Sequence, residues 1–316
     1  MTLDIEQATA ILRRGGLVAF PTETVYGLGA DAENPAAVAR IFAAKGRPEN
    51  HPVIVHIGHT GLLEYWAADI PPSALLLAQS FWPGPLTLIL KRNARVLDAV
   101  TGGQDTVGLR MPDHPVALAL LSAFGGGVAA PSANRFGRIS PTTALHVRDE
   151  LGETVDCILD GGPCRVGIES TILDLSGAHP QLLRPGAISA AAIESVLGQP
   201  LVEASHAAPR VPGTLKSHYA PRTPLILIPP QDLKTEFDWR HKNGGRIVVL
   251  ARSVAAPNFQ CAWYVMPVDP DGYARELYAQ LRALDELHAE HILIEAVPPE
   301  SIWQAVRDRL ARASQR

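Results

Sequence analysis

The chain has 316 residues, of which 47% are hydrophobic and 19% are charged, and its formal net charge is −4. This composition excludes a disordered chain, and the mild acidity excludes a polybasic surface built to grip a long polyanion. A nucleotide is still an acceptable ligand, because its few phosphates need only a few well-placed cations. At roughly 150 residues per domain, the length predicts about two domains.

Short apolar runs alternate with amphipathic segments in the N-terminal part. The predicted strands are residues 17–20, 53–57, 86–90, 107–110, 128–130, 157–159 and 171–175. The predicted helices are residues 4–14, 35–45, 73–81 and 114–124, the second with Asn34 as N-cap and Pro35 at its first position. Some strands are separated by helices while others follow one another directly, which predicts a mixed α/β sheet.

Prolines gather between residues 200 and 224 and divide the chain. Because proline lacks an N–H group and fixes φ, a helix or a central strand is not expected there. We therefore predict a first domain over 1–200, a linker over 201–223 and a small second domain over 224–316. In the second domain, strands are predicted at 225–228, 246–250, 263–266 and 292–297, with helices at 273–288 and 301–313. This order predicts a small α/β layer with a parallel sheet.

Several kinds of site are not indicated. Cys157, Cys164 and Cys261 form no CxxC pair, which favours free thiols in a reducing cytoplasm. The sequence contains no run of about 18 apolar residues, so no membrane span is predicted. The first residues do not have the pattern of a signal peptide. GxxxxGKS/T, GxGxxG, GxSxG and HExxH motifs are absent from the sequence. A site would therefore act by positioning substrates and neutralising phosphate charge, without a covalent nucleophile or a protein metal cage.

Polar residues gather where predicted strands end. PTETVYGLG (21–29) reads as a turn closed by two glycines, Arg110 ends a strand, and VAAPSANRFGRISPT (128–142) combines small residues with hydroxyls and an amide. Ligands of α/β sheets bind at strand ends, so these segments are candidates for a binding site. An ordinary polar turn, a surface ion pair and a serine-rich loop are the respective alternatives.

Two further features allow two interpretations each. Lys45 and Arg47 flank a glycine at a predicted helix end, where they would form a phosphate clamp or would only complement the helix dipole. His56 lies in the apolar strand VIVHI, where a structural role is as acceptable as a ligand-binding one.

Taken together, the segments resemble one family, the YrdC-like domain of threonylcarbamoyl-AMP synthases. The matching segments, in order, are FPTETVYGLG, KGRP, VIVHI, WPGPLTLIL, TVGLRMP, APSAN, SPT, ESTILDL and LLRPG. VPGTLKSHYAP resembles the linker of the long, two-domain form, so the match covers nearly the whole chain. The resemblance implies a YrdC-like twisted mixed sheet with helices, whose concave face holds the nucleotide, plus a small Rossmann-like C-terminal domain.

The resemblance also implies a cytoplasmic enzyme and its reaction. L-threonine, bicarbonate and ATP, with Mg²⁺ carried by the ATP phosphates, give threonylcarbamoyl-AMP, pyrophosphate and water. The product then passes to a separate transferase complex that modifies adenosine 37 of tRNA, so neither membrane binding nor stable nucleic-acid binding is expected.

Site residues follow from the same resemblance. The threonine pocket is implied to contain Thr24, His56, Arg110, Ala130 and Ser170. The ATP side is implied to contain Lys45, Arg47, His51, Thr106, Ser132, Asn134, Ser140, Arg184 and Tyr219, the last as a lid from the linker. No residue is assigned as the base for the threonine amine.

The sequence departs from the family pattern at three positions, one after the KGRP segment and two in the linker. His51 replaces the usual asparagine and would add a pH dependence near its ordinary pKa of about 6.5. In the linker, Thr214 replaces a methionine and Ser217 replaces an arginine. Two alternative functions are a carbamoyl-transfer module like that of hydrogenase maturation proteins and a non-catalytic RNA-binding module.

Overall fold

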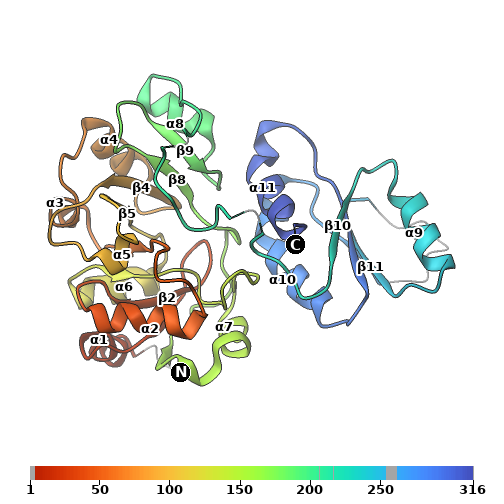
Figure 1. Ribbon diagram of the computed structural model, residues 1–316, viewed down its shortest axis with the longest axis horizontal. Helices are drawn as coiled ribbons and strands as arrows, with labels where there is room; N and C mark the ends of the chain where they lie inside the picture. The colour runs from red at the N-terminus through yellow and green to blue at the C-terminus, as the bar shows by residue number, and fades with distance from the viewer. Residues whose placement is uncertain (1–3, 206, 216, 254–261, 316) are drawn as a thin grey trace. The chain divides into compact units, whose positions relative to one another are not determined.

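The computed structural model describes residues 4–205, 207–215, 217–253 and 262–315. The chain divides into two compact units. The first comprises Met1–Phe136 and Ser140–Thr214, and the second comprises Gly137–Ile139 and Leu215–Arg316. Each unit contains its own sheet (Figure 1).

Among the described residues, the first unit contains a nine-stranded mixed sheet in the order β7-β1-β2-β6-β3-β5-β4-β8-β9. The strands are β1 (Val18–Phe20), β2 (Gly27–Asp31), β3 (Ile54–His56), β4 (Leu86–Lys91), β5 (Thr106–Arg110), β6 (Val128–Ala129), β7 (Cys157–Ile158), β8 (Thr171–Asp174) and β9 (Gln181–Arg184). The pairs β1–β7, β3–β5 and β4–β8 are parallel, and the remaining pairs are antiparallel. The mixed α/β sheet predicted from the sequence is confirmed.

Helices cover both faces of this sheet. They are α1 (Ile5–Arg13), α2 (Pro35–Lys45), α3 (Leu63–Trp66), α4 (Pro72–Phe81), α5 (Asp98–Thr101), α6 (Pro115–Phe124), α7 (Ala144–Leu151) and α8 (Ala190–Leu197). Side chains alternate along a strand, so Leu17 and Ala19 enter the core shared with α2, while Val18 and Phe20 enter the core shared with α1 and α6. Burial on both faces explains why this strand is a continuous apolar run.

Helix α2 begins and ends as the sequence predicts. The Asn34 side-chain oxygen accepts the N–H groups of Ala36 and Ala37 at 3.1 and 3.2 Å, a cap worth about 1 kcal/mol. Gly46 ends the helix with φ +60°, a conformation that glycine adopts without strain. This ending places Lys45 and Arg47 at the last turn.

The interpretation of residues 21–29 as a turn closed by glycines is wrong for its second half. Gly27 and Gly29 lie inside β2, which pairs with β1. A Cβ atom on Gly29 would come within 2.8 Å of the Phe20 and Val128 side chains. The glycine is therefore needed for close packing within the sheet rather than for a turn.

In the described part of the second unit, the sheet is four-stranded and parallel, as predicted, in the order β10-β13-β11-β12. Its elements are β10 (Leu225–Ile228), α9 (Leu233–Lys242), β11 (Ile247–Ala251), β12 (Ala262–Val265), α10 (Pro270–Asp285), β13 (His291–Glu295) and α11 (Gln304–Ala313). Helix α9 was not predicted, because only Leu233 and Phe237 of its ten residues are buried and its apolar periodicity is weak.

Tyr219 is held by contacts within the second unit. Its side chain is buried, its ring stacks on Tyr278 with centroids 5.7 Å apart, and the Arg309 guanidinium lies 5.2 Å from its centroid. The Asp285 carboxylate accepts the N–H groups of Arg222 and Thr223, which fixes the chain that follows. The role of Tyr219 as a lid stays a prediction, and so do the linker boundaries 201–223.

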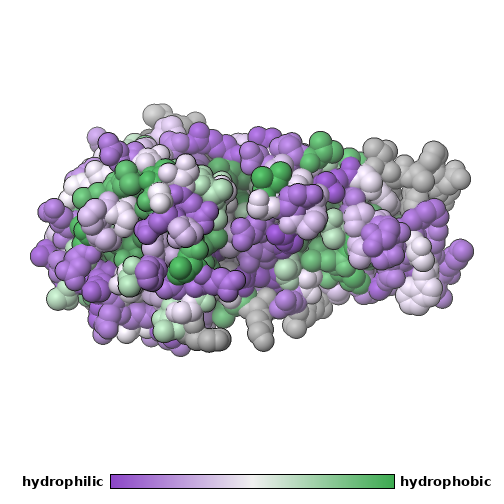
Figure 2. Space-filling view, turned by 90° about the horizontal axis from the view of Figure 1, so that it is seen from above, coloured by the Kyte–Doolittle hydropathy of each residue, from purple (hydrophilic) through white to green (hydrophobic). Residues whose placement is uncertain are grey.

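The surface and the thiols agree with a globular protein. Figure 2 shows a face that is mainly hydrophilic with separate hydrophobic areas. Cys157 and Cys164 are free thiols, whereas Cys261 lies outside the described residues. Within the described part of the chain, no helix combines the length and apolar character needed to cross a membrane.

Candidate active site

His56 and Arg110 lie side by side at the carboxyl ends of two parallel strands. The register of β3 and β5 pairs His56 with Arg110. Paired residues of neighbouring strands point to the same face of a sheet, so both side chains share one location. They are 3% and 4% exposed, which means that two ionisable groups meet inside the fold.

Glu23 provides the counter-charge for Arg110. Arg110 Nη2 lies 2.7 Å from Glu23 Oε2, and Arg110 Nε donates to the Gly84 carbonyl at 3.3 Å. A buried guanidinium is costly unless it is paired, so Glu23 allows Arg110 to remain inside. No role for Glu23 was predicted, although an acidic residue just after a buried strand is an available signal.

The His56 ring is neutral under ordinary conditions. Burial lowers the pKa of His56 to about 3, and the Arg110 cation acts in the same direction. A neutral imidazole can form a hydrogen bond with a substrate. A ring with this pKa cannot retain the proton of an amine near pH 7, so His56 is a poor candidate for that base.

We expect the stability contributed by His56 to fall as the pH falls. The unfolded pKa is about 6.5 and the folded one is lower, so the folded chain binds fewer protons. The contribution is fully present above about pH 6.5 and decreases below it by up to about 1.4 kcal/mol per pH unit. Substitution His56→Gln removes this titration. The melting temperatures of the variant and the wild-type protein, followed by circular dichroism, should differ less at about pH 5 than at about pH 7. A difference that does not change with pH would contradict the assignment.

A tight turn holds the backbone on both sides of Glu23. Thr22 Oγ1 accepts the N–H groups of Thr24 and Val25 at 3.1 and 3.2 Å, and the Thr22 and Thr24 hydroxyl oxygens lie 2.8 Å apart. A hydroxyl that accepts N–H groups two and three residues later stabilises a turn. Both threonines are buried, so the turn belongs to the interior of the candidate site.

Ser170 and Arg184 form a buried hydrogen-bonded pair at the start of β8. Arg184 Nε and Nη2 donate to the Ser170 carbonyl at 3.0 and 2.8 Å, and Ser170 Oγ lies 2.8 Å from Thr87 Oγ1. Arg184 Nη1 donates to the Pro212 carbonyl at 2.9 Å. One arginine thus ties the sheet to the segment that follows it in the same unit.

Lys45 connects the end of α2 to the loop that contains the APSAN segment. Lys45 Nζ donates to the carbonyl oxygens of Ser132 and Asn134, and the Lys45 carbonyl accepts the N–H of Phe136 at 2.8 Å. Burial, followed by the Arg47 cation, lowers the pKa of Lys45 well below its ordinary value. The lysine was predicted as a phosphate contact, and two of its three donors already hold the loop.

The Phe136 ring contacts two predicted residues of the ATP side, Arg47 and His51, which the sequence did not indicate. Its ring centroid is 5.7 Å from the Arg47 guanidinium and 5.3 Å from the His51 ring centroid. Arg47 also donates to the Pro52 carbonyl at 2.7 Å. Partial burial, then nearby arginine cations, lower the pKa of His51, so the expected pH dependence shifts below pH 6.5.

The Ser140 hydroxyl is hydrogen-bonded to a carboxylate of the same unit. Its hydroxyl donates to Glu169 Oε1 at 2.6 Å, and both residues are buried. Glu169 belongs to the ESTILDL segment, yet no role was predicted for it. The pair joins the loop before α7 to the start of β8.

Some of the predicted threonine and ATP residues lie at opposite ends of β3 and β5, whereas Ser170 and Arg184 contact each other directly. Thr106 begins β5 and Arg110 ends it, about 13 Å apart along the strand. Arg47 and His51 precede β3, at the same end as Thr106 because the strands are parallel. Among the other assigned positions, the Ala130 N–H donates to the Ile54 carbonyl at 2.9 Å, Ser132 bridges to Gly27, and Tyr219 belongs to the second unit.

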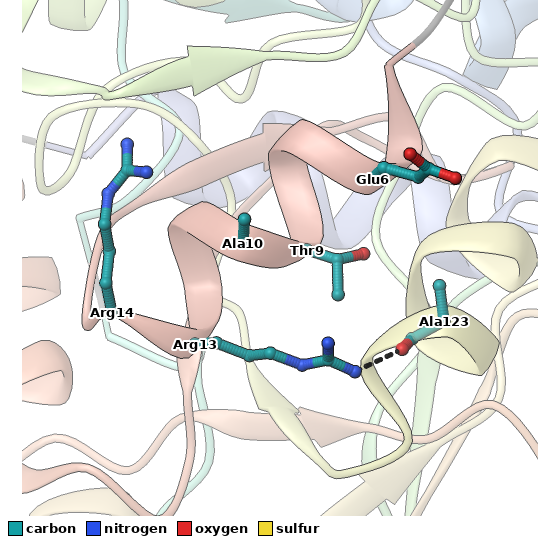
Figure 3. Close-up of a pocket in the computed structure, with 6 residues that line it drawn as sticks. All are labelled: Glu6, Thr9, Ala10, Arg13, Arg14 and Ala123. Atoms are coloured by element: carbon teal, nitrogen blue, oxygen red, sulfur yellow. Dashed lines mark hydrogen bonds between the residues drawn. The ribbon is translucent and has the colours of Figure 1, made fainter.

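A separate cavity of about 590 Å³ lies on α1 next to α6 (Figure 3). It is lined by Glu6, Thr9, Ala10, Arg13, Arg14 and Ala123. Arg13 Nη2 donates to the Ala123 carbonyl at 2.9 Å across it. None of the predicted site residues lines this cavity, so the chemistry described above does not take place there.

Two family models together match nearly the whole chain. The model described as "Telomere recombination" matches residues 10–186. The model described as "Threonylcarbamoyl-AMP synthase, C-terminal domain" matches residues 188–315.

Individual relatives extend over the same length. The threonylcarbamoyl-AMP synthase of Pyrococcus abyssi is 41% identical over 320 residues, covering 98% of this chain and 94% of that protein. The Bacillus subtilis protein of the same name is 41% identical over 321 residues, covering 98% and 92%. The crystal structure of P. abyssi Sua5 complexed with L-threonine is similar with a TM-score of 0.92 at 39% identity, covering 98% of this chain and 94% of that one.

Proposed function

The chain belongs to the threonylcarbamoyl-AMP synthase family, and on this premise we propose that it condenses L-threonine, bicarbonate and ATP into threonylcarbamoyl-AMP, pyrophosphate and water. The observation that carries the proposal is the buried Arg110 beside neutral His56 at the carboxyl ends of β3 and β5. Arginine forms strong, charge-assisted hydrogen bonds with carboxylates, and threonine presents a carboxylate. The relative crystallised with L-threonine supports this choice of substrate.

The first chemical step joins threonine to carbon dioxide or bicarbonate. The neutral amine of threonine forms a nitrogen–carbon bond, and the amine loses a proton. With bicarbonate, the carbon loses its hydroxyl group as water. In this step Arg110 would hold the carboxylate, while Thr24, His56, Ala130 and Ser170 would form the pocket around it. The proton acceptor is left unassigned.

The second step transfers the adenylyl group. A carbamate oxygen forms a bond to the α-phosphorus of ATP while the bond to the β-phosphate oxygen breaks, and pyrophosphate leaves. Crowded negative charge has to be neutralised, which we assign to Arg47 and Lys45. The contacts to the rest of ATP are assigned to His51, Thr106, Ser132, Asn134, Ser140 and Arg184.

Mg²⁺ enters this scheme as part of the MgATP substrate. Magnesium usually keeps several waters and binds through phosphates and one or two carboxylates. The described residues contain no group of three or more His, Cys, Asp or Glu side chains placed so that they could hold a metal ion. The proposal needs no such group, because the ATP phosphates provide the main ligands.

Tyr219 is proposed to close the site as a lid that protects the product from water. An acyl phosphate-like product hydrolyses, so exclusion of water would increase its yield. The contacts with Tyr278 and Arg309 would define the position from which the tyrosine acts. The product would then be used by a separate complex that modifies adenosine 37 of tRNA.

The reaction is tested with purified protein, MgATP, L-threonine and bicarbonate, with pyrophosphate as the readout. We expect release that requires both threonine and bicarbonate, with threonylcarbamoyl-AMP detected by mass spectrometry. Release with carbamoyl phosphate instead of threonine would favour a carbamoyl-transfer module. Tight RNA binding without turnover would favour an RNA-binding module.

A further inference from the structure

We propose that Glu23 is a positioning residue for threonine, which holds the Arg110 guanidinium so that its remaining amino group faces the substrate carboxylate. This inference rests on the proposed function, because it assumes that threonine is the ligand of Arg110. Glu23 would not touch the substrate itself. It would act only through the orientation and charge of the arginine.

The geometry of Arg110 leaves one amino group for a ligand. Nη2 is engaged by Glu23 at 2.7 Å, and Nε is engaged by the Gly84 carbonyl at 3.3 Å. Nη1 has no hydrogen bond or ion pair with any of the described residues. Because the guanidinium is planar and rigid, fixing two nitrogens fixes the direction of the third. Glu23 therefore decides where the third nitrogen points.

The carboxylate itself is held in place by its surroundings. The Glu23 side chain is 1% exposed, and the buried turn between Thr22 and Thr24 fixes its backbone. The Glu23 carbonyl also accepts the N–H of Val166 at 2.8 Å. A rigid carboxylate can orient its partner, whereas an exposed and mobile one cannot.

Charge gives the pair a second effect that can be measured. With Arg110 present, Glu23 is neutralised and does not oppose an incoming carboxylate. If Arg110 is removed, Glu23 becomes an unpaired buried anion, since neither of its carboxylate oxygens has a hydrogen-bond partner among the described residues. The remaining anion would then repel the threonine carboxylate. Glu23 should thus help threonine binding only when Arg110 is present.

The test uses the full-length variants Glu23→Gln, Arg110→Gln and the double variant. Threonine KM, ATP KM and kcat are measured by pyrophosphate release, and the threonine Kd is measured by calorimetry without ATP. Glu23→Gln should raise the threonine KM and Kd by about ten- to a hundredfold, because the buried ion pair that orients Arg110 is lost. Its kcat and ATP KM should change by less than about threefold, because the carboxylate is remote from the reacting bonds.

The double variant supplies the sharper comparison. Adding Glu23→Gln to Arg110→Gln should lower the threonine Kd, the opposite sign to its effect in the wild-type protein. If Glu23→Gln alone does not fold, the Arg110→Gln and double variants still report the sign of the Glu23 effect without the arginine, and an unchanged or higher threonine Kd in the double variant would overturn the inference. Additive effects, or equal rises in the threonine and ATP KM values, would overturn the inference.

Glu295→Gln is the matched control for loss of a buried carboxylate. Glu295 is 5% exposed and accepts the N–H groups of Arg252 and Ser253 in the second unit. This variant should lower the melting temperature without changing the threonine Kd, and a changed Kd would overturn the specific role of Glu23. Threonine binding without turnover by the wild-type protein would overturn the proposed function alone, and the binding constants would still decide the role of Glu23.

Discussion

Replacement of Arg110 by alanine is expected to raise the threonine KM by at least about a hundredfold, which corresponds to roughly 3 kcal/mol. The ATP KM should change by less than about threefold. Arg110 ends β5, whereas the predicted ATP residue Thr106 begins it. The substitution by alanine therefore removes a charge from one end of the strand only. The Arg110→Lys variant should not restore binding, because an ammonium lacks the planar fork that reaches both Glu23 and a carboxylate.

Initial rates at varied threonine and ATP concentrations test this expectation. Loss of Arg110 also leaves Glu23 buried without its partner, which costs about 3–5 kcal/mol of folding free energy. Thermal unfolding of the variant must therefore be measured first, and kinetics compared well below the melting temperature. Arg13→Ala is the control, since Arg13 is an exposed arginine on α1 outside the candidate site. Equal increases in both KM values would refute the role assigned to Arg110.

Replacement of Lys45 by methionine is expected to lower kcat/KM for ATP by roughly a hundred- to a thousandfold, or about 3–4 kcal/mol. Methionine retains the apolar stem but loses the donors to the Ser132 and Asn134 carbonyls. Those carbonyls would lose their Lys45 donor, and the loop carrying two proposed ATP contacts would lose its position. The threonine Kd measured without ATP should change by less than about threefold.

Lys234→Met provides the comparison for Lys45→Met. Lys234 is exposed and forms a surface ion pair with Asp238 on α9 of the second unit, so its removal should leave the kinetics unchanged. Lys45→Arg should not restore activity, because Lys45 is buried and a bulkier guanidinium would have to displace the groups packed around its two carbonyl contacts. A Lys45→Met protein that binds ATP with wild-type affinity would exclude the lysine from the nucleotide side.

Features that depend on neighbours in the chain were predictable. The Asn34 cap, Pro35 and the glycine at position 46 define helix α2 through local hydrogen bonds and backbone freedom. The LVAF run, residues 17–20, predicted a strand buried on both faces, and its side chains do enter two cores. Local rules failed where close packing decided the outcome, as at Gly29, which lies in β2 where Phe20 and Val128 leave no room for a Cβ atom.

The partners of the site residues were beyond the reach of the sequence. Glu23 meets Arg110, Ser140 meets Glu169, and Lys45 meets the carbonyl of Ser132, each across a separation that no local pattern describes. Such contacts form because strand order and register bring distant segments together. The residue types at strand ends indicated a polar site, but they did not indicate which charges neutralise each other.

By itself, the sequence determined the class of fold, the membership of the family and most of the candidate residues, because these follow from periodicity, local capping and ordered motifs. The tertiary structure decided the partners and the protonation of those residues. Burial leaves His56 neutral. The fold also pairs Arg110 with Glu23 and hydrogen-bonds Lys45 to the loop backbone. Charge and protonation inside a protein depend on surrounding dielectric and partners, and only the folded chain supplies both.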